Sequence, residues 1–333
     1  MTATIGATHA QGVFTKMAWG ALATPHTFDA TAVPYDFLTE NIARRVRFIG
    51  GNEIRGTRVA PGIRVREGER YFYGPIQKYI SQIELDTLIP RFLGDESANV
   101  FAPDEDIPYF SMLLYRDEGI FTTPPKSTFE YKYCKIDRVE IRGRAPQIGE
   151  EGEPDMVTAT FHIMASDRAL TAWPGTIPAF GTADTYAPIV FPDCSETAYL
   201  NGSAIDIEEF VISVNNHLQA KYTNSLTPHS IMPRGRTVRL ALRLPWNDTT
   251  DALLHNPTGG APVLWTGDNY LLFTHPTIAI STKFEFGDLY VNFEDPTADK
   301  GKGQVSLVIN AVSYSATSKA WDLKITNDST NTP

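Results

Sequence analysis

Two stretches of the sequence decide the fold, and they resemble one another. Val157–Trp173 is VTATFHIMASDRALTAW and Val305–Trp321 is VSLVINAVSYSATSKAW, and both end in Ala-Trp, 148 positions apart (321 − 173). In both stretches apolar residues alternate with polar ones, which is the period of a strand with one buried face. A repeated strand segment predicts an internal duplication, and a duplication governs the whole fold.

Weaker matches follow in the same order along the chain. Lys135–Asp137 aligns with Lys283–Glu285, again 148 positions apart (283 − 135). Further upstream the spacing is larger: Val46–Asn52 aligns with Phe210–Asn216 at 164 (210 − 46), and Asp86–Ile89 aligns with Asp251–Leu254 at 165 (251 − 86). The drop in spacing is explained if the first copy carries an inserted loop. We therefore predict four parts, which are an N-terminal arm (1–40), a first domain (41–173) with an insertion at about 94–128, a linker (174–195) and a second domain (196–333).

The periodicity predicts many strands and few helices. Alternating apolar residues mark Val238–Leu244, and further strands are expected at Val46–Ile49, Arg70–Gln77 and Lys126–Arg142. Helical spacing occurs at Ser81–Leu93, where Pro90 is expected to break the helix, and at Asn247–His255. The expected fold class is mainly β, with two tandem β-sandwich or partial-barrel domains that each carry a short flanking α-helix.

The bulk composition is that of an ordinary globular protein. The chain has 333 residues, of which 42% are hydrophobic and 20% charged. It contains neither an apolar run near the ~20 residues that span a bilayer nor the pattern of a secretory signal, so no membrane role is expected. Two cysteines, Cys134 and Cys194, favour a reducing compartment and packed thiols. A net charge of −10 argues against general affinity for nucleic acid, yet it suits a surface past which a polyanion must slide.

No pattern of catalytic or metal-binding residues stands out. The seven histidines form no zinc-binding spacing, and His162 aligns with Asn310, so the expected repeat does not preserve an imidazole. No nucleophile elbow, phosphate-binding loop or dinucleotide-binding glycine pattern is present. We therefore predict a protein that is not an enzyme and has no cofactor or metal. Strand aromatics such as Tyr71 and Tyr131 could stack on sugars, so a carbohydrate-binding or carbohydrate-active β-sandwich is kept as an alternative.

Arginines crowd corresponding segments of the two copies. They either cover a solvated strand face or pair with acidic residues of a neighbouring subunit, a role that suits the guanidinium group. The candidate subunit-interface residues are Arg55, Arg58, Arg64, Arg66, Arg234 and Arg236, together with Trp19 and Tyr35 of the arm.

Several loose motifs occur together along the chain. They are Trp19-Gly20 before Thr24-Pro25, Asp36–Ile42 before Asn52–Arg58, Phe210–Asn216 before Pro233–Arg236, and Gly301–Leu307. Their order resembles that of the tail-tube, or major tail, proteins of long-tailed (siphophage-type) bacteriophages. The resemblance spans most of the chain, and the segment 94–128 departs from it.

The resemblance implies a function in assembly. It implies two tail-tube-like domains in a structural virion protein, whose rings stack into a hollow tube that conducts DNA. Because such rings are commonly sixfold, three chains of two domains imply a homotrimeric, pseudo-hexameric ring, closed by head-to-tail contacts. The implied partners are further copies of the chain, tape measure and terminator proteins, and DNA only transiently and non-specifically in the lumen. The implied location is the virion tail after assembly in the host cytoplasm. Another virion ring component, such as a tail terminator or baseplate protein, is the second alternative.

Overall fold

The computed structural model describes residues 15–21, 33–49, 66–97, 100–104, 106–116, 127–145, 156–172, 188–194, 198–254, 263–275, 280–293, 297–299, 304–315 and 319–328. Over these residues the chain consists mostly of antiparallel strands, so the expected mainly-β class is confirmed.

Most strands belong to one sheet of 14 strands, which we call the large sheet. Its main path runs through β17 (Val263–Trp265), β20 (Asp288–Phe293), β22 (Gln304–Tyr314), β16 (Thr237–Pro245), β13 (Glu209–Asn215), β9 (Ser127–Arg144), β10 (Thr158–Ala172), β5 (Arg66–Tyr79) and β3 (Thr39–Glu40). Its other members are β1 (Thr15–Ala21), β2 (Val33–Tyr35), β4 (Ala43–Ile49), β8 (Phe110–Arg116) and β21 (Thr297–Asp299).

The small sheet has 7 strands in the order β12 (Ser203–Ala204), β11 (Tyr199–Leu200), β18 (Asn269–Thr274), β19 (Ser281–Phe286), β23 (Leu323–Asp328), β7 (Val100–Pro103) and β6 (Gly94–Ser97). A separate hairpin joins β14 (Gln219–Lys221) to β15 (Ser230–Met232), and a short 3-10 helix, η3, spans Phe191–Cys194.

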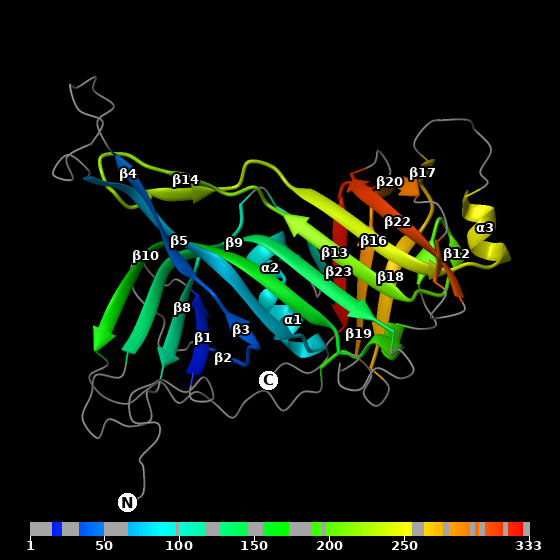
Figure 1. Cartoon of the computed structure of the whole chain (residues 1–333), viewed down its shortest axis with the longest axis horizontal. Coiled ribbons are helices and arrows are strands. Elements are labelled where there is room, and N and C mark those ends of the chain that lie inside the picture. Colours follow the sequence, from blue (N-terminus) through cyan, green and yellow to red (C-terminus); the bar gives the residue numbers. More distant parts are fainter. Residues whose placement is uncertain are drawn as a thin grey trace, which may run out of the picture.

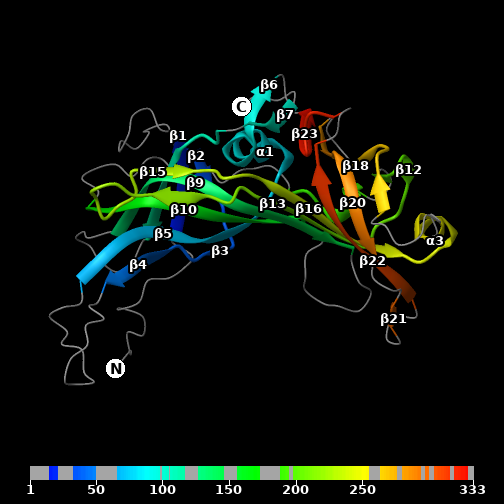
Figure 2. The same cartoon turned by 90° about the horizontal axis from the view of Figure 1, so that it is seen from above.

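The large sheet is long and curved, and its two faces differ (Figures 1 and 2). The helices α1 (Gln82–Leu88) and α2 (Pro90–Leu93), with the small sheet, lie on one face. Apart from the β14–β15 hairpin, which contacts β10, no described helix or strand covers the opposite face over β9, β13 and β16, and we call this the open face. One hydrophobic cluster runs through both halves of the chain, including Phe161 on β10 and Ile309 on β22.

The two halves place a short helix after the same strand with the same cap. Ser81 Oγ accepts a hydrogen bond from the Glu84 backbone nitrogen, and the Glu84 carboxylate accepts one from the Ser81 backbone nitrogen. Asn247 and Thr250 make the same reciprocal pair before α3 (Asp248–Leu254). The two caps lie 166 positions apart (247 − 81). Pro90 divides the first helix into α1 and α2, as its missing N–H predicts.

Strand order also repeats. Strands β3/β4, β5, β10 and β9 follow one another across the sheet as β13, β16, β22 and β20 do. His162 lies opposite Pro75 on one side, and Asn310 lies opposite Ala241, which is 166 positions after Pro75 (241 − 75). The halves of the described chain therefore share one register as well as one strand order.

This register corrects three local alignments. Phe210 corresponds to Glu40, not Val46, because Phe210 pairs with Leu242 and Glu40 pairs with Ile76, the two partners being 166 apart (242 − 76). The helices are likewise 166 apart rather than 165. Lys135 corresponds to Tyr290 rather than Lys283: Lys135 pairs with Met164, and Tyr290 pairs with Val312, 148 positions after Met164 (312 − 164).

Two segments differ from their expected character. The expected arm contributes β1, which pairs with β8 and β2, and Trp19 on it is only 1% exposed. The expected inserted loop contains β6, β7 and β8, and β7 pairs with β23 through Phe101 and Ile325. Both segments are apolar enough at alternating positions to enter the core. Residues 173–187, most of the expected linker, lie outside the described residues.

Candidate assembly interface

The two halves meet where β9 pairs antiparallel with β13. The register runs from Arg144 opposite Glu209 to Arg138 opposite Asn215, and we call this contact the internal joint. In the order across the sheet, β9 is the outermost of the strands β3/β4, β5, β10 and β9 of the first repeat, and β13 is the first strand of the second repeat. This is a head-to-tail contact between two similar units inside one chain.

The apolar side of the joint depends on Phe210. Its side chain is buried and packs against Phe191 and Phe273, with ring centroids 6.0 and 5.4 Å away. Gly143 lies opposite Phe210 on β9, and a Cβ there would come within 2.5 Å of the Phe210 ring. A glycine at this place therefore lets the ring lie across the neighbouring strand.

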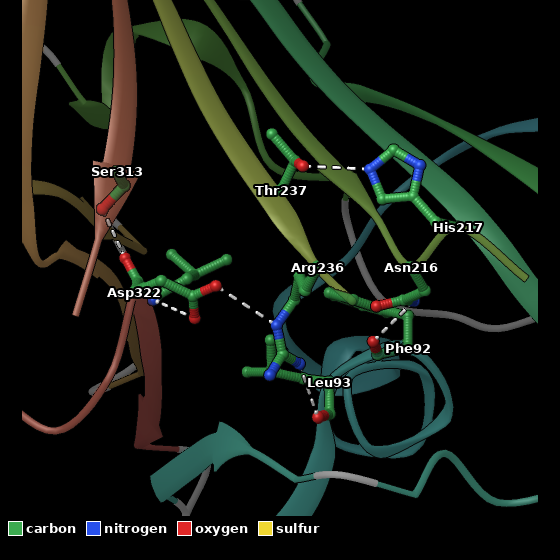
Figure 3. A network of polar contacts seen from close by, with 9 residues as sticks. Phe92, Leu93, Asn216, His217, Arg236, Thr237, Ser313 and Asp322 are labelled. Atoms are coloured by element: carbon green, nitrogen blue, oxygen red, sulfur yellow. Dashed lines mark hydrogen bonds and ion pairs between the residues drawn. The ribbon is translucent and has the colours of Figure 1, made fainter. Parts of the chain in front are cut away.

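The polar side of the joint depends on Asn216, which is 2% exposed (Figure 3). Its Nδ2 donates to the carbonyl oxygens of Phe92 and Ile136, at 3.0 and 3.1 Å. Its backbone nitrogen donates to the Asp137 carbonyl at 2.7 Å, and the Leu218 nitrogen donates to Asp137 Oδ1 at 2.7 Å. The end of α2 and an irregular point of β9 are thus held by the strand end of the second half.

Asn216→Ala is expected to lower the free energy of unfolding by about 2–3 kcal/mol, because two buried carbonyls lose their donor. Urea denaturation of the unassembled chain measures the loss. Ser213→Ala, at a half-buried position of β13 on the open face, is the matched control and should change stability by less than about 0.5 kcal/mol. Equal stability of both variants would contradict this role for Asn216.

Arg236, like Asn216, binds the end of α2 from the second half of the chain. Its Nη1 donates to the Leu93 carbonyl at 3.1 Å and its Nε donates to Asp322 Oδ2 at 3.3 Å (Figure 3). A cation at the carbonyl end of a helix also complements the helix dipole. A groove of about 680 Å³ beside it is lined by Asn216, Arg236 and Asp322 among others.

The other sequence-predicted residues are scattered. Arg66 and Arg234 are exposed, and Tyr35 lies on β2 opposite Met17 of β1. Trp19 lies inside the core of the chain itself. Arg55, Arg58 and Arg64 lie outside the described residues. A role of these residues between subunits stays a prediction.

On the open face, two arginines of β9 lie beside one glutamate. Glu140 lies 2.7 Å from Arg138 and 3.6 Å from Arg142. Burial, reinforced by the Arg138 guanidinium, lowers the pKa of His162 below its ordinary value. Burial and the Asp137 carboxylate raise the pKa of Tyr73, whose hydroxyl donates to that carboxylate at 3.0 Å. This face is polar and mixed in charge.

Each end of the large sheet leaves a strand edge open in the described chain. Strands β3 and β4 pair only with β5 among the described strands. At the other end β17 covers β20 at residues 289–291, and no described strand covers the outer side of residues 292–293 or of β21. Open edges are places where another chain can add a strand.

No described group of three histidine, cysteine, aspartate or glutamate side chains is placed to hold a metal ion. In the described part of the chain, no helix has the length and apolar character to span a bilayer.

Comparison with known proteins gives one family. A search of curated proteins finds no match to the chain. The model of the family described as phage tail tube protein matches residues 12–320, nearly the whole length of the chain. This match confirms the resemblance found in the sequence motifs. The chain belongs to the phage tail tube protein family, and its role is that of a structural protein of the virion tail.

Proposed function

We propose that three copies of this chain close into a ring of six similar units, and that the rings stack into a hollow siphophage-type tail tube through which DNA passes. The observation that supports this most directly is the internal joint, where β13 of one unit pairs with β9 of the unit before it. A head-to-tail contact of this kind, repeated between chains, closes into a ring when its rotation permits. In this proposal the chain works by assembling into the tube and catalyses no reaction.

The charge of the open face suits a conduit for DNA if that face lines the bore. Phosphates bind proteins mainly by displacing counterions at unmatched cations. On the open face, Arg138 and Arg142 already have Glu140 as a partner. The net charge of −10 acts in the same direction. DNA would then pass without lasting attachment.

Assembly in the host cytoplasm, with tape measure and terminator proteins as partners, belongs to the same proposal. Sedimentation and negative-stain microscopy of the full chain over a concentration series test it. We expect a species near 111 kDa, three times the 36.9 kDa chain mass, and stacked rings at high concentration. A monomer at every concentration would contradict the proposal. Single rings that never stack would favour a terminator or baseplate component.

A further inference from the structure

We infer that the contact between chains copies the internal joint strand for strand. Residues 292–293 of β20 and strand β21 of one chain pair antiparallel with β3 and with β4 as far as Arg45 of the next chain, so that Asn292 lies opposite Arg45, while the rest of β20 keeps β17 as its neighbour. The inference rests on the proposed ring and adds to it the two edges and their register.

The register follows from residues that lie side by side across the sheet. In the first repeat a row runs from Pro75 on β5 through His162 and Arg138 to Asn215, the first residue beyond the joint. The same row in the second repeat runs through Ala241, Asn310 and Asn292, and it ends there in the described chain. Asn292 therefore stands where Arg138 stands, with no described residue in the place of Asn215.

Arg45 is the counterpart of Asn215. Asn215 pairs with Thr237, and Arg45 pairs with Tyr71, which precedes Thr237 by 166 positions (237 − 71). Both residues thus hold the same place in their repeats. Placing Arg45 of the next chain opposite Asn292 gives an arginine–asparagine pair, as at the internal joint. At the internal joint the arginine is on β9 and the asparagine on β13, whereas between chains the asparagine is on β20 and the arginine on β4.

In both repeats a short strand already covers one part of this edge: β8 covers part of β9, and β17 covers part of β20. On β9, Phe110 of β8 lies opposite Cys134, while residues 138–144 receive β13. On β20, Trp265 of β17 lies opposite Leu289 and Val263 lies opposite Val291, and residues 292–293 receive no described strand on that side. The position of β8 is therefore filled in both repeats, whereas the position of β13 is filled in only one.

Charge favours this partner over a second copy of the same edge. Residues 39–49, which span β3 and β4, contain three arginines and one acidic residue, whereas residues 288–299 contain four acidic residues and no basic one. The internal joint also joins a basic segment (138–144, three arginines and one glutamate) to an acidic one (209–215, one glutamate). Opposite charge across a contact favours the correct partner, and two arginine-rich edges would repel each other. Arg45 is exposed, as an edge residue awaiting a partner should be.

Disulfide trapping tests the register. Residues directly opposite in an antiparallel pair have Cα atoms about 4.5–5.5 Å apart, within the reach of a disulfide. In a Cys194→Ser background, Arg45→Cys with Asn292→Cys should convert most of the chain into covalent trimer under mild oxidation, seen on non-reducing gels. Arg138→Cys with Asn215→Cys is the positive control, because that bond forms within one chain and adds no mass.

A register-shifted pair is the matched negative control. Arg45→Cys with Asp288→Cys keeps the same sheet face but displaces one residue by four positions, about 13 Å. We expect little covalent trimer from this pair. Rings in the microscope without the Arg45–Asn292 bond, or with a stronger bond from the shifted pair, would overturn the register and leave the proposed ring intact. The absence of both rings and bonds would overturn the ring and this inference with it.

Discussion

Lys78→Leu is expected to lower the free energy of unfolding by about 3–5 kcal/mol, because it breaks a buried ion pair by removing one partner. Lys78 on β5 is 2% exposed, and its Nζ lies 2.5 Å from the Glu84 carboxylate at the start of α1. The substitution takes away the ammonium group while the carboxylate stays in the core. Urea denaturation of the unassembled chain measures the loss.

The second repeat supplies the control for this prediction. Leu244 and Thr250 are the counterparts of Lys78 and Glu84, each 166 positions later, and both are fully buried (244 − 78, 250 − 84). Thr250 also keeps the reciprocal cap, because its hydroxyl accepts a hydrogen bond from the Asn247 nitrogen at 2.9 Å. The double variant Lys78→Leu/Glu84→Thr should therefore regain most of the lost stability. A double variant as unstable as the single one would refute this account of the pair.

Trp19→Ala is expected to cost about 3–5 kcal/mol of unfolding free energy, the usual range for deleting a buried aromatic side chain. The Trp19 ring stacks on Phe110 with centroids 5.1 Å apart and meets the edge of Phe161 at 5.8 Å. The Arg91 guanidinium lies 5.6 Å from the ring centroid, which adds a cation–π contact. The loss should appear in the isolated chain at low concentration.

Measuring at low concentration distinguishes a Trp19 that stabilises the core of the single chain from one that acts only in contacts between subunits. If Trp19 served subunit contacts alone, the dilute chain would unfold at the same urea concentration as wild type, and only ring formation would suffer. Leu38→Ala is the control, because that side chain is 43% exposed and its truncation should cost less than about 0.5 kcal/mol.

The sequence was sufficient for the local elements. Alternation identified β10 and β22, and helical spacing with Pro90 identified the broken helix. It was less reliable for register, because alternation has a period of two and cannot distinguish alignments that differ by an even number of residues. The alignment of Phe210 with Val46 differs from the true one, Glu40, by six (46 − 40), so the face pattern still matched.

The contacts between halves could not be predicted from local patterns. Asn216 stood out only as one of two adjacent asparagines, and its bonds to Phe92 and Ile136 join residues more than 75 positions away. Trp19 was assigned to an arm because residues 1–40 are rich in alanine and threonine and hold few charges, yet its partners Phe110 and Phe161 come from distant strands. Such roles depend on tertiary pairing, for which one sequence gives no periodic signal.

The pairing of β7 with β23 has a consequence for the newborn chain. Phe101 meets Ile325, 224 positions later (325 − 101), so the hairpin of β6 and β7 waits for its neighbour until that residue has been synthesised. At ribosomal speeds of about 5–20 residues per second, the delay is on the order of 10 to 45 seconds. During that time the edge of β7 that later pairs with β23 has unpaired backbone groups, and such an edge can pair with another chain. Protection of the nascent polypeptide, by chaperones or by the ribosome itself, therefore matters most over this interval.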